Sequence, residues 1–551
     1  MGRFRARAVC ATVAIAGGLV MTLRGQVANE SRLQILENVG LPAVDEGLLQ
    51  DDSHTPRAPE ARQRAALREA LLHDRIGASG THYRAGRVIV RFRDEAAMTD
   101  RRAAVRSASD TGEIAARPSY ADFDVVRIDP SEDAEAAAAV LRQRPEVQYA
   151  QVAHRVHALF VPNDPLYLSH QWNLPMINME KAWDIQPQAG STIIVAVIDT
   201  GMAYQNATLT ATLPAFQDAN GTQYPALGSV IIPYSAAQQL VSPSAASRIV
   251  APHDFVNESA TPLDYDGHGT HVSGTIGQLT NDGIGTAGVA FNVKLMPVKV
   301  LASAWDLLFA GVTDIANVGG SDDDVARGIR YAADNGAKII NMSLGSSGPP
   351  DCATKPNQSD CSPVIEAAMR YAVGKGCFIT VAGGNEFEDT VPLYGMNPTS
   401  VIAEIASRIP GAVSVAAVDR AKAHAYYSSS GSYIELAAPG GSERGFGIDG
   451  YVVQQTFDFT LTDTFLQPPA QFVAPRFDVF GYIGYIGTSM AAPHVAGVAA
   501  MLMQQGITDP AAIEDILEKT AVDLGAPGRD NTFGFGLVDA RAALRGLGLA
   551  K

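Results

Sequence analysis

The sequence predicts an α/β protein whose mostly parallel sheet carries helices on both faces and follows a smaller α+β domain. Residues 192–198 are a continuous apolar, β-branched run, typical of a strand buried on both faces of a parallel sheet. Residues 377–382 repeat this pattern. Residues 490–503 are apolar on every side, which is typical of a helix buried all round. Strands and helices with no polar face need covering layers, which an α/β fold provides.

The first element is a predicted secretory signal peptide over residues 1–28. Residues 1–7 contain three arginines, and residues 8–23 are apolar but shorter than a normal membrane span. Cleavage after Ala28 is plausible, although Gln26 is not the usual small residue. An uncleaved N-terminal anchor is the alternative. We expect a secreted protein, extracellular or periplasmic.

An extension and a small domain come next. Residues 29–84 are uneven in composition, and we interpret them as an N-terminal extension or linker. Residues 85–157 have the pattern of a compact α+β unit. Its predicted elements are strands at residues 87–92, 123–128 and 147–152 and a helix at residues 132–142.

A serine stands at the start of the predicted buried helix. Ser489 follows two small residues in the segment GTSMAAPHVAG, and Pro493 falls in the first turn, where no backbone donor is lost. Free backbone N–H groups and the helix dipole favour negative charge at this end of a helix. Ser489 is therefore a candidate nucleophile whose oxyanion those amides would hold, although an ordinary helix-capping serine has the same pattern.

Asp199 and His268 are candidate partners for this serine. Asp199 ends the strand of residues 192–198, and open α/β sheets place their sites at the carboxyl ends of strands. An aspartate that only begins a turn is the alternative. His268 lies between glycines at the start of a helix-like stretch, whereas we expect His271 to point inward. This His-x-x-His pair lacks the glutamate and the spacing of the usual zinc-protease motif, which argues against zinc.

Three segments closely resemble the signature blocks of the subtilases, the subtilisin-like serine proteases. They are VIDTG at residues 197–201, HGTHV at residues 268–272 and GTSMAAPH at residues 487–494, in the family's order Asp, His, Ser. The resemblance implies a subtilisin-like fold and a catalytic triad. In that triad Ser489 attacks the peptide carbonyl, His268 transfers the proton, and Asp199 holds the imidazole.

A fourth block concerns the oxyanion and the substrate backbone. The strand of residues 377–382 ends in GGNE, and the resemblance implies that Asn385 donates a hydrogen bond to the oxyanion. A turn asparagine is the alternative. After a strand at residues 338–340, the chain resembles the family's substrate-backbone segment, where an extended peptide would add as a β-strand. The segment is Ser343, Leu344 and Gly345, and an ordinary strand and turn is the alternative.

The order of elements in residues 85–157 resembles the ferredoxin-like inhibitory propeptide of subtilases. Such a propeptide chaperones the folding of a slow-folding parallel sheet and then occupies the cleft. The resemblance implies a catalytic domain at residues 158–551 and self-cleavage near residues 157–161. The expected partners are polypeptide substrates and the chain's own propeptide, and we expect a monomer. A small domain of unrelated purpose is the alternative.

The resemblance also implies a structural calcium ion. Asp164 and Asp282 would give carboxylate oxygens. The further ligands would be backbone carbonyls of Thr280, Ile284 and Thr286. The family's further carboxylate after Asp199 is not identified, because the chain runs there into an insertion at residues 204–250. Two unrelated surface acids are the alternative.

Charge and cysteine content limit the other partners. The net charge of -16 argues against nucleic acid or an anionic membrane as a main partner, and we expect no membrane partner beyond export. Cys352 and Cys361 bracket a short polar loop and could form a disulfide outside the cytosol. We expect Cys377 to pack as a small apolar residue rather than to act in catalysis.

These patterns together predict a secreted serine endopeptidase made as a self-processing zymogen. An inactive subtilase-fold binding protein is one alternative, and the intact triad and Asn385 argue against it. A lipase-type serine esterase is another, but it would need Gly-x-Ser-x-Gly and a different order of triad residues. Two insertions, residues 204–250 and 441–484, are expected at the cleft end of the sheet, where loops carry specificity.

Overall fold

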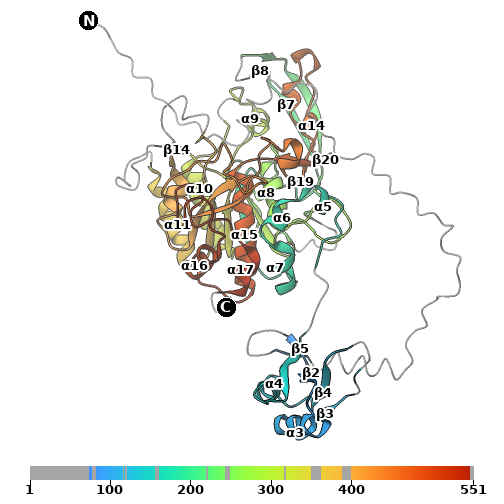
Figure 1. Ribbon diagram of the computed structural model, residues 1–551. Helices are drawn as coiled ribbons and strands as arrows, with labels where there is room; N and C mark the ends of the chain where they lie inside the picture. The colour runs from blue at the N-terminus through green and yellow to red at the C-terminus, as the bar shows by residue number, and fades with distance from the viewer. Residues whose placement is uncertain are drawn as a thin grey trace, which may run out of the picture. The chain divides into compact units, whose positions relative to one another are not determined.

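The computed structural model describes most of the chain from residue 74 onward. The described residues are 74–76, 82–115, 117, 121–154, 160–218, 221–241, 248–315, 318–348, 361–387 and 399–546. They divide into two compact units on either side of residue 158 (Figure 1). The predicted signal peptide, most of the predicted extension and Cys352 lie outside the described residues. Within the described residues, no helix is long and apolar enough to cross a membrane.

The smaller unit is an antiparallel sheet with two helices. Its elements are β1 (Asp74–Ile76), β2 (His82–Phe92), α3 (Met98–Ala108), β3 (Glu113–Ile114), β4 (Asp124–Arg127), α4 (Ala134–Arg142) and β5 (Val147–His154). The strands lie in the order β5–β2–β4–β3, with β1 also paired to β2. This order confirms the predicted ferredoxin-like fold. The unit contains α3 and β3, which the sequence patterns did not predict, and its strands begin before residue 85.

Alternation along β2 explains why the two helices cover one face of this sheet. Val88, Val90 and Phe92 are buried, whereas the residues between them are partly exposed. Successive side chains of a strand point to opposite faces, so these three share the face that packs on α3 and α4. Helix α4 begins after Asp133, whose carboxylate accepts hydrogen bonds from two amides of the first turn.

The larger unit is built on a seven-stranded sheet in which every pairing is parallel. In spatial order the strands are β11 (His253–Asp254), β12 (Lys294–Lys299), β6 (Ile194–Asp199), β13 (Ile339–Met342), β15 (Phe378–Ala382), β17 (Ala412–Val418) and β18 (Leu436–Pro439). The two predicted runs at residues 192–198 and 377–382 form β6 and β15 near the middle of the sheet. Their side chains are almost entirely buried, which confirms the parallel α/β prediction.

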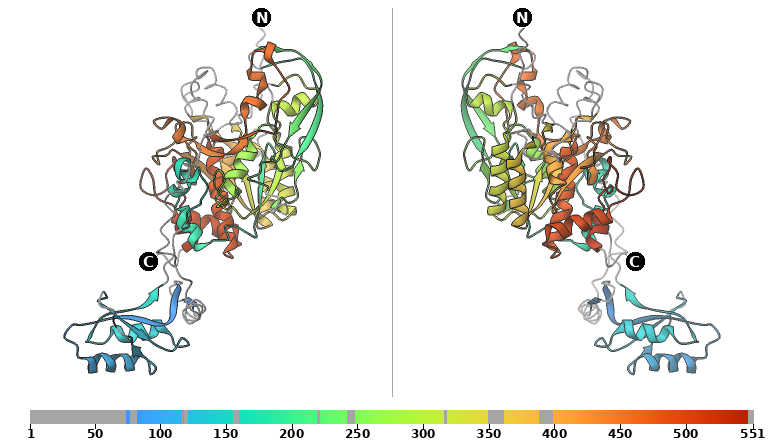
Figure 2. Two further views of the ribbon diagram at one scale, coloured as in Figure 1. Left: turned by 90° about the vertical axis from the view of Figure 1, so that its right-hand side faces the viewer. Right: turned by 90° about the vertical axis from the view of Figure 1, so that its left-hand side faces the viewer.

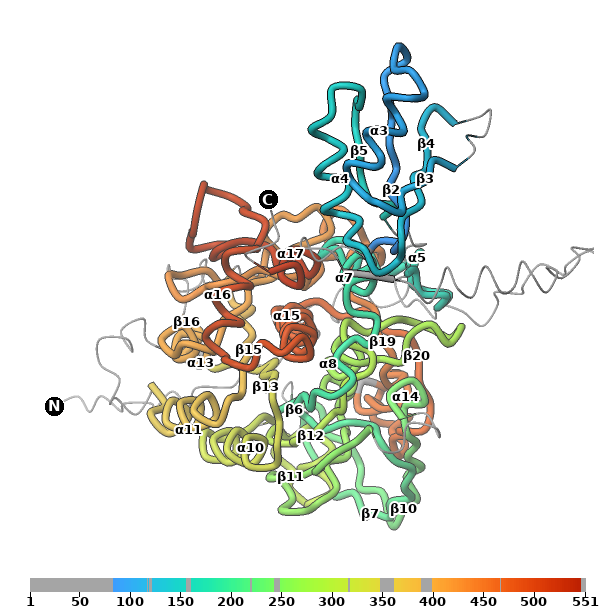
Figure 3. Tube along the Cα trace, turned by 90° about the horizontal axis from the view of Figure 1, so that it is seen from below, coloured from blue at the N-terminus to red at the C-terminus, as the bar shows by residue number. Residues whose placement is uncertain are grey.

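Helices cover both faces of this sheet, as Figure 3 shows in a view along it. Helices α10 (Asp322–Asp334) and α11 (Pro363–Gly374) lie on one face, and α8 (His268–Gly277) and α15 (Thr488–Gln504) lie on the other. Helix α15 is buried from Thr488 to Met503, as its apolar sequence predicts. The remaining helices are α5 (Tyr167–His170), α6 (Asn173–Met176), α7 (Met179–Ile185), α9 (Ala304–Phe309), α13 (Val401–Ala406), α14 (Phe459–Thr462), α16 (Pro510–Thr520) and α17 (Ala540–Arg545).

Short antiparallel pairs complete the larger unit. They are β7 (Ala207–Leu213) with β10 (Leu227–Tyr234), β8 (Phe216–Gln217) with β9 (Gln223–Tyr224), β14 (Ser347–Gly348) with β16 (Thr399–Ser400), and β19 (Val452–Phe457) with β20 (Phe480–Tyr485). Three single-turn 3-10 helices, η5 (Gly447–Gly450), η6 (Thr464–Leu466) and η7 (Pro469–Gln471), lie between β18 and β20.

The two predicted insertions pack against each other. The first contains β7 to β10, and the second contains β19, α14 and β20 (Figure 2). Phe216 and Tyr224 of the first stack with ring centroids 4.8 Å apart, and Phe472 of the second packs edge-on against both. The Thr456 hydroxyl of the second donates to the carbonyl of Gly267, directly before α8. The insertions therefore lie at the same end of the sheet as Asp199 and His268.

The cysteines described in the structure are structural. Cys377 is buried, and its thiol donates to the carbonyl of Ala337, so it packs as the sequence predicts. Burial raises the pKa of its thiol to about 11, which keeps it unreactive at neutral pH. Cys361 is disulfide-bonded, and its predicted partner Cys352 lies outside the described residues.

Candidate active site

Asp199 and His268 meet at the carboxyl end of the sheet. Asp199 is the last residue of β6, His268 is the first of α8, and both are buried. The Nδ1 of His268 lies 2.7 Å from Oδ1 of Asp199, which also accepts from the Thr200 amide. Since a carboxylate only accepts, Nδ1 carries a proton, and in the neutral imidazole Nε2 then has a free lone pair. Nε2 is buried and bonded to no group in the described structure, as a general base awaiting a proton would be.

The surroundings of His268 favour its protonated form. Burial by itself lowers the pKa of His268, but the charge of Asp199 and its hydrogen bond raise it, and Asp266 and Asp264 add to this. The net effect raises the pKa above its ordinary value. An imidazolium formed at this position would therefore be stabilised.

Ser489 lies at the N-terminus of α15, which packs against α8. Its side chain is almost completely buried, and its hydroxyl donates to the carbonyl of Ser343 at 3.3 Å. It is thus not bonded to His268 in this rotamer, and the structure brings Ser489 to the site without forming the Ser–His hydrogen bond. Catalytic hydrogen bonds are often loose in unliganded enzymes and tighten when substrate binds.

Asn385 follows β15 and is oriented by the residue before Ser489. Its Oδ1 accepts from the amide and the hydroxyl of Thr488, both at 2.8 Å. The Thr488 hydroxyl in turn accepts from the amide of Gly384 at 3.1 Å. Because the amide oxygen is occupied, the Nδ2 donor is the end left for a ligand, and it lies beside Gly487. This is the orientation that an oxyanion donor next to Ser489 requires.

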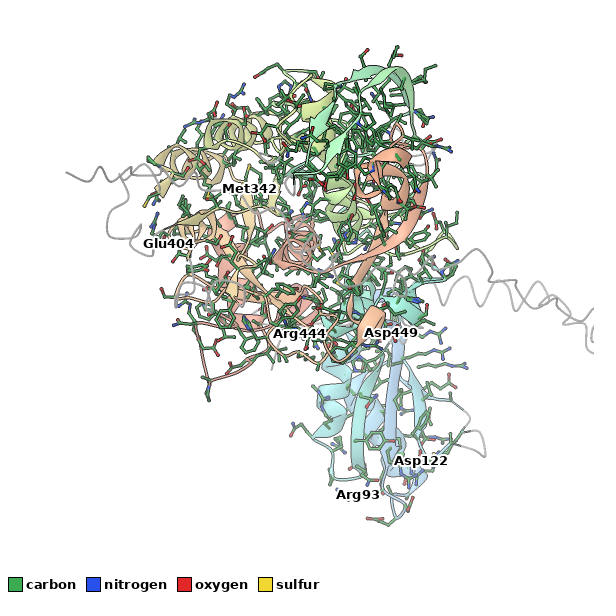
Figure 4. The ribbon with its side chains drawn as sticks, turned by 90° about the horizontal axis from the view of Figure 1, so that it is seen from above. Arg93, Asp122, Met342, Glu404, Arg444 and Asp449 are labelled. Atoms are coloured by element: carbon green, nitrogen blue, oxygen red, sulfur yellow. The ribbon has the colours of Figure 1, made fainter. Side chains whose placement is uncertain are left out.

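The predicted substrate segment follows β13, whose last residue, Met342, is labelled in Figure 4. Ser343 and Leu344 are buried, and Gly345 is half-buried. The Ser343 hydroxyl donates to the carbonyl of Ser489 at 2.7 Å, while its carbonyl accepts from the Ser489 hydroxyl. The structure therefore brings this segment directly beside Ser489, so a peptide lying along it would pass the Ser489 hydroxyl.

Asp264 is a site residue that the sequence analysis missed. It is buried, and its carboxylate accepts five hydrogen bonds. The donors are the Thr200 hydroxyl, the amides of Asp266 and Gly267, and the amide and hydroxyl of Thr270. Thr200 follows Asp199, and Gly267 precedes His268, so Asp264 ties together the turns that carry the two residues. An acid four positions before the histidine was the available signal, but it also fits a simple Asx turn.

The predicted calcium residues also converge. Asp164 is buried, and its Oδ2 accepts from the Asn281 amide at 2.7 Å, while its Oδ1 is buried with no partner in the described structure. Gln239 of the first insertion was missed. Its Nε2 donates to Oδ2 of Asp282 at 3.2 Å, and its Oε1 is likewise buried and unpaired. Burial, with the charge of Asp282, raises the pKa of Asp164 to about 6. Thr280, Ile284 and Thr286 lie in the same loop.

Comparison with known proteins shows the family of the chain. Residues 190–536, more than half of the chain, match the subtilase family. The chain is a subtilase. Residues 74–152 match the fervidolysin N-terminal prodomain, so the smaller unit of this subtilase is a prodomain. Membership of the family makes the protein a serine-type endopeptidase.

Several named proteases are similar to this subtilase along most of its length. The thermophilic serine proteinase of Bacillus sp. (strain AK1) is 27% identical over 446 residues, which cover 81% of this chain and 84% of that protein. Thermitase of Thermoactinomyces vulgaris is 28% identical over 65% of this chain and 92% of its own. An extracellular protease of Xanthomonas campestris is 31% identical over 76% of this chain and 63% of its own. The crystal structure of fervidolysin from Fervidobacterium pennivorans has a TM-score of 0.46 and 22% identity, and covers 84% of this chain and 61% of its own.

Proposed function

We propose that this subtilase hydrolyses peptide bonds with Asp199, His268 and Ser489 as its catalytic triad. The observation that carries the proposal is the buried 2.7 Å bond between His268 and Asp199, which leaves Nε2 unpaired at the end of the sheet where Ser489 lies. An imidazole oriented in this way can take the serine proton on Nε2, and the imidazolium that results can give that proton to the leaving amine.

The reaction follows from these positions. The Ser489 oxygen attacks the peptide carbonyl while His268 takes its proton, and the new bond makes a tetrahedral oxyanion. Nδ2 of Asn385 and the backbone amide of Ser489 hold that oxyanion. Collapse of the intermediate breaks the C–N bond, and His268 protonates the leaving amine, which leaves an acyl-enzyme. Water then attacks the acyl-enzyme while His268 takes its proton, and His268 returns a proton to the Ser489 oxygen as the carboxylic acid product leaves.

Covalent labelling tests this assignment. A fluorophosphonate probe is expected to label the wild-type protein and to miss Ser489→Ala. The matched control is Ser273→Ala, because Ser273 is a buried serine of α8 whose hydroxyl makes no hydrogen bond in the described structure. It should label like the wild type. Equal labelling of Ser489→Ala, or none of the wild type, would sink the proposed triad in favour of an inactive subtilase-fold protein.

Asn385→Ala is expected to lower kcat by about 100- to 1,000-fold, the range found when a single oxyanion donor is removed. KM should change little, because the donor acts on the charge that develops after substrate binds. Steady-state kinetics on a peptide substrate measure both constants. Thr488→Val is the informative companion variant. It removes one of the two donors that orient Asn385 and should cost less. If Asn385→Ala raised KM and left kcat unchanged, the oxyanion role would be wrong.

The prodomain makes this subtilase a zymogen in our proposal. We infer an inhibitory propeptide at residues 85–157, a catalytic domain at residues 158–551 and self-cleavage near residues 157–161. The propeptide acts as an intramolecular inhibitor and chaperone, and the mature enzyme acts as a monomer. We further infer export through the signal at residues 1–28. The prodomain match and the relatives named as extracellular proteases support this reading.

We also infer a structural calcium ion bound by Asp164 and Asp282. The residues fit such an ion because two buried oxygens, Oδ1 of Asp164 and Oε1 of Gln239, are otherwise unsatisfied, and an unsatisfied buried oxygen is costly. Carboxylate and amide oxygens are the ligands that calcium prefers. Gln239 would then supply the ligand that the sequence analysis could not identify. Backbone carbonyls of the loop would complete the set, at Thr280, Ile284 and Thr286.

Calcium removal is expected to destabilise the protein. An ion held at 100 times its Kd contributes about 2.7 kcal/mol, so EDTA should lower Tm by several degrees. Scanning calorimetry with calcium and with EDTA measures the difference. Asp164→Asn should shrink it, whereas Asp449→Asn, a change at an exposed residue of η5, should preserve it. An identical Tm in both buffers would refute the calcium site.

A further inference from the structure

A buried ion pair lies directly behind the turn that follows Asp199. Lys299 is the last residue of β12 and pairs in register with Asp199. Its side chain has no exposed surface. Its ammonium donates to Oδ2 of Asp306 at 3.0 Å and to the carbonyls of Thr200 at 2.6 Å and Leu263 at 3.1 Å. All three N–H donors of the lysine are thus used, and none faces solvent.

Asp306 supplies the countercharge from a separate element. It lies in the first turn of α9, and its Oδ2 also accepts from the amide and the hydroxyl of Ser303 at 2.8 Å. Its Oδ1 accepts from Nδ2 of Asn257 at 3.3 Å. These hydrogen bonds fix the carboxylate independently of the lysine. Trp305, the preceding residue, anchors α9 by donating to the carbonyl of Thr462 in the second insertion.

The two carbonyls that Lys299 holds belong to the two turns of the triad. Thr200 directly follows Asp199, and Leu263 directly precedes Asp264. The Thr200 hydroxyl donates to Asp264 and accepts from the amide of Gly269, the residue after His268. The ammonium and Asp264 thus join the same two turns at different points. Removing the ammonium would leave two buried carbonyls facing each other without a donor, a repulsive arrangement that the turns can relieve only by moving apart.

We propose that Lys299, paired with Asp306, is a positioning residue that holds the Asp199 turn against the turn before His268 and so maintains the hydrogen bond of the triad. The proposal rests on the triad proposed above. Lys299 does not touch substrate; it acts through the backbone of Thr200 and Leu263. A misplacement of about 1 Å between catalytic groups can cost about 100-fold in rate. If the two turns move apart, kcat should therefore fall.

A charge-neutral double variant separates positioning from simple stability. Lys299→Met with Asp306→Leu replaces a buried ion pair by apolar side chains of similar size, so neither partner is left as an unpaired buried charge. It leaves the net charge around His268 unchanged, so Asp199, Asp264 and Asp266 still face the imidazole. What it removes is the donor that both turns share. Lys519→Met with Asp515→Leu, at an exposed pair of α16, is the matched control.

The double variant should still fold and unfold cooperatively, while kcat falls at least about 10-fold and KM changes less than twofold. The acidic limb of the kcat/KM profile should move to lower pH, because a loosened Asp199 raises the pKa of His268 less. Wild-type kcat and an unmoved limb would overturn the proposal, whatever the Tm. The control pair should change none of these quantities.

A second variant guards against failure to fold. Asp306→Asn keeps the shape of the side chain but leaves the buried Lys299 ammonium without its countercharge, so the ammonium should no longer hold its place between the two turns. It should show the same loss of kcat and the same shift of the limb, and normal values in a folded protein would count against the proposal. Fluorophosphonate labelling distinguishes failure of the proposed triad from failure of the proposed role of Lys299. Wild-type protein that is not labelled at Ser489 defeats the triad itself, whereas equally fast labelling of wild type and variants defeats only the role of Lys299.

Discussion

Ser489→Ala is expected to reduce peptide hydrolysis by at least about 10,000-fold and to leave the precursor uncut. Alanine has no atom that can attack the carbonyl, so neither the base nor Asn385 can make up for the loss. The remaining rate comes from the oxyanion donors and from binding alone. The Ser489 hydroxyl donates one long hydrogen bond in the described structure, at 3.3 Å to the Ser343 carbonyl, so its removal should disturb the fold little. A loss of activity at unchanged Tm would therefore report on chemistry.

Expression of the precursor in both forms gives the measurement. The wild type should yield a shortened chain, and N-terminal sequencing should place the cut near residues 157–161. Ser489→Ala should remain full length, and Ser273→Ala should be processed like the wild type. Equal processing of all three would show that another protease makes the cut, and self-processing would be rejected. The sequence around the cut would also reveal one peptide bond that the enzyme accepts.

The sequence predicts those parts of the fold whose hydrophobic pattern lies within one continuous segment. A strand buried on both faces needs a continuous apolar run, and a helix buried all round needs apolar residues on every side. Residues 192–198 and 490–503 therefore reveal β6 and α15 directly. Asp199 directly follows the first run, and Ser489 directly precedes the second. The sequence does not predict α3 and β3. Helix α3 is largely exposed and β3 has only two residues, so neither shows a clear hydrophobic periodicity.

The missed site residues act through partners distant in sequence. Gln239 reaches Asp282 across 43 positions, and its neighbours in the insertion give no hint of an ion site. Lys299 looks like the polar end of a strand, yet it is fully buried. Only the register of β12 beside β6 places it behind Asp199. Asp264 fits an ordinary turn until its five donors are seen together. In each case the decisive contact is made by tertiary packing, which no local pattern records.

Asp199→Asn is expected to lower kcat/KM at neutral pH by about 10,000-fold while leaving the fold intact. Asparagine has nearly the same shape, but its amide can donate to Nδ1 of His268, and this favours the tautomer with the proton on Nε2. That nitrogen could then no longer accept the Ser489 proton. The control is Asp509→Asn, the same chemical change at the N-cap of α16, where asparagine serves as well as aspartate.

The pH dependence of kcat/KM in Asp199→Asn gives a second, independent test of the role of Asp199. In the wild type the charge and hydrogen bond of Asp199 raise the pKa of His268 against the opposing effect of burial. Without that charge, burial dominates and the pKa falls. His268 works as a base only when neutral, so the acidic limb of kcat/KM must move to lower pH in the variant. A limb that stayed in place would mean that a group other than His268 sets it. A limb that moved to higher pH would contradict the assigned role of Asp199, because removing an anion cannot strengthen the base beside it.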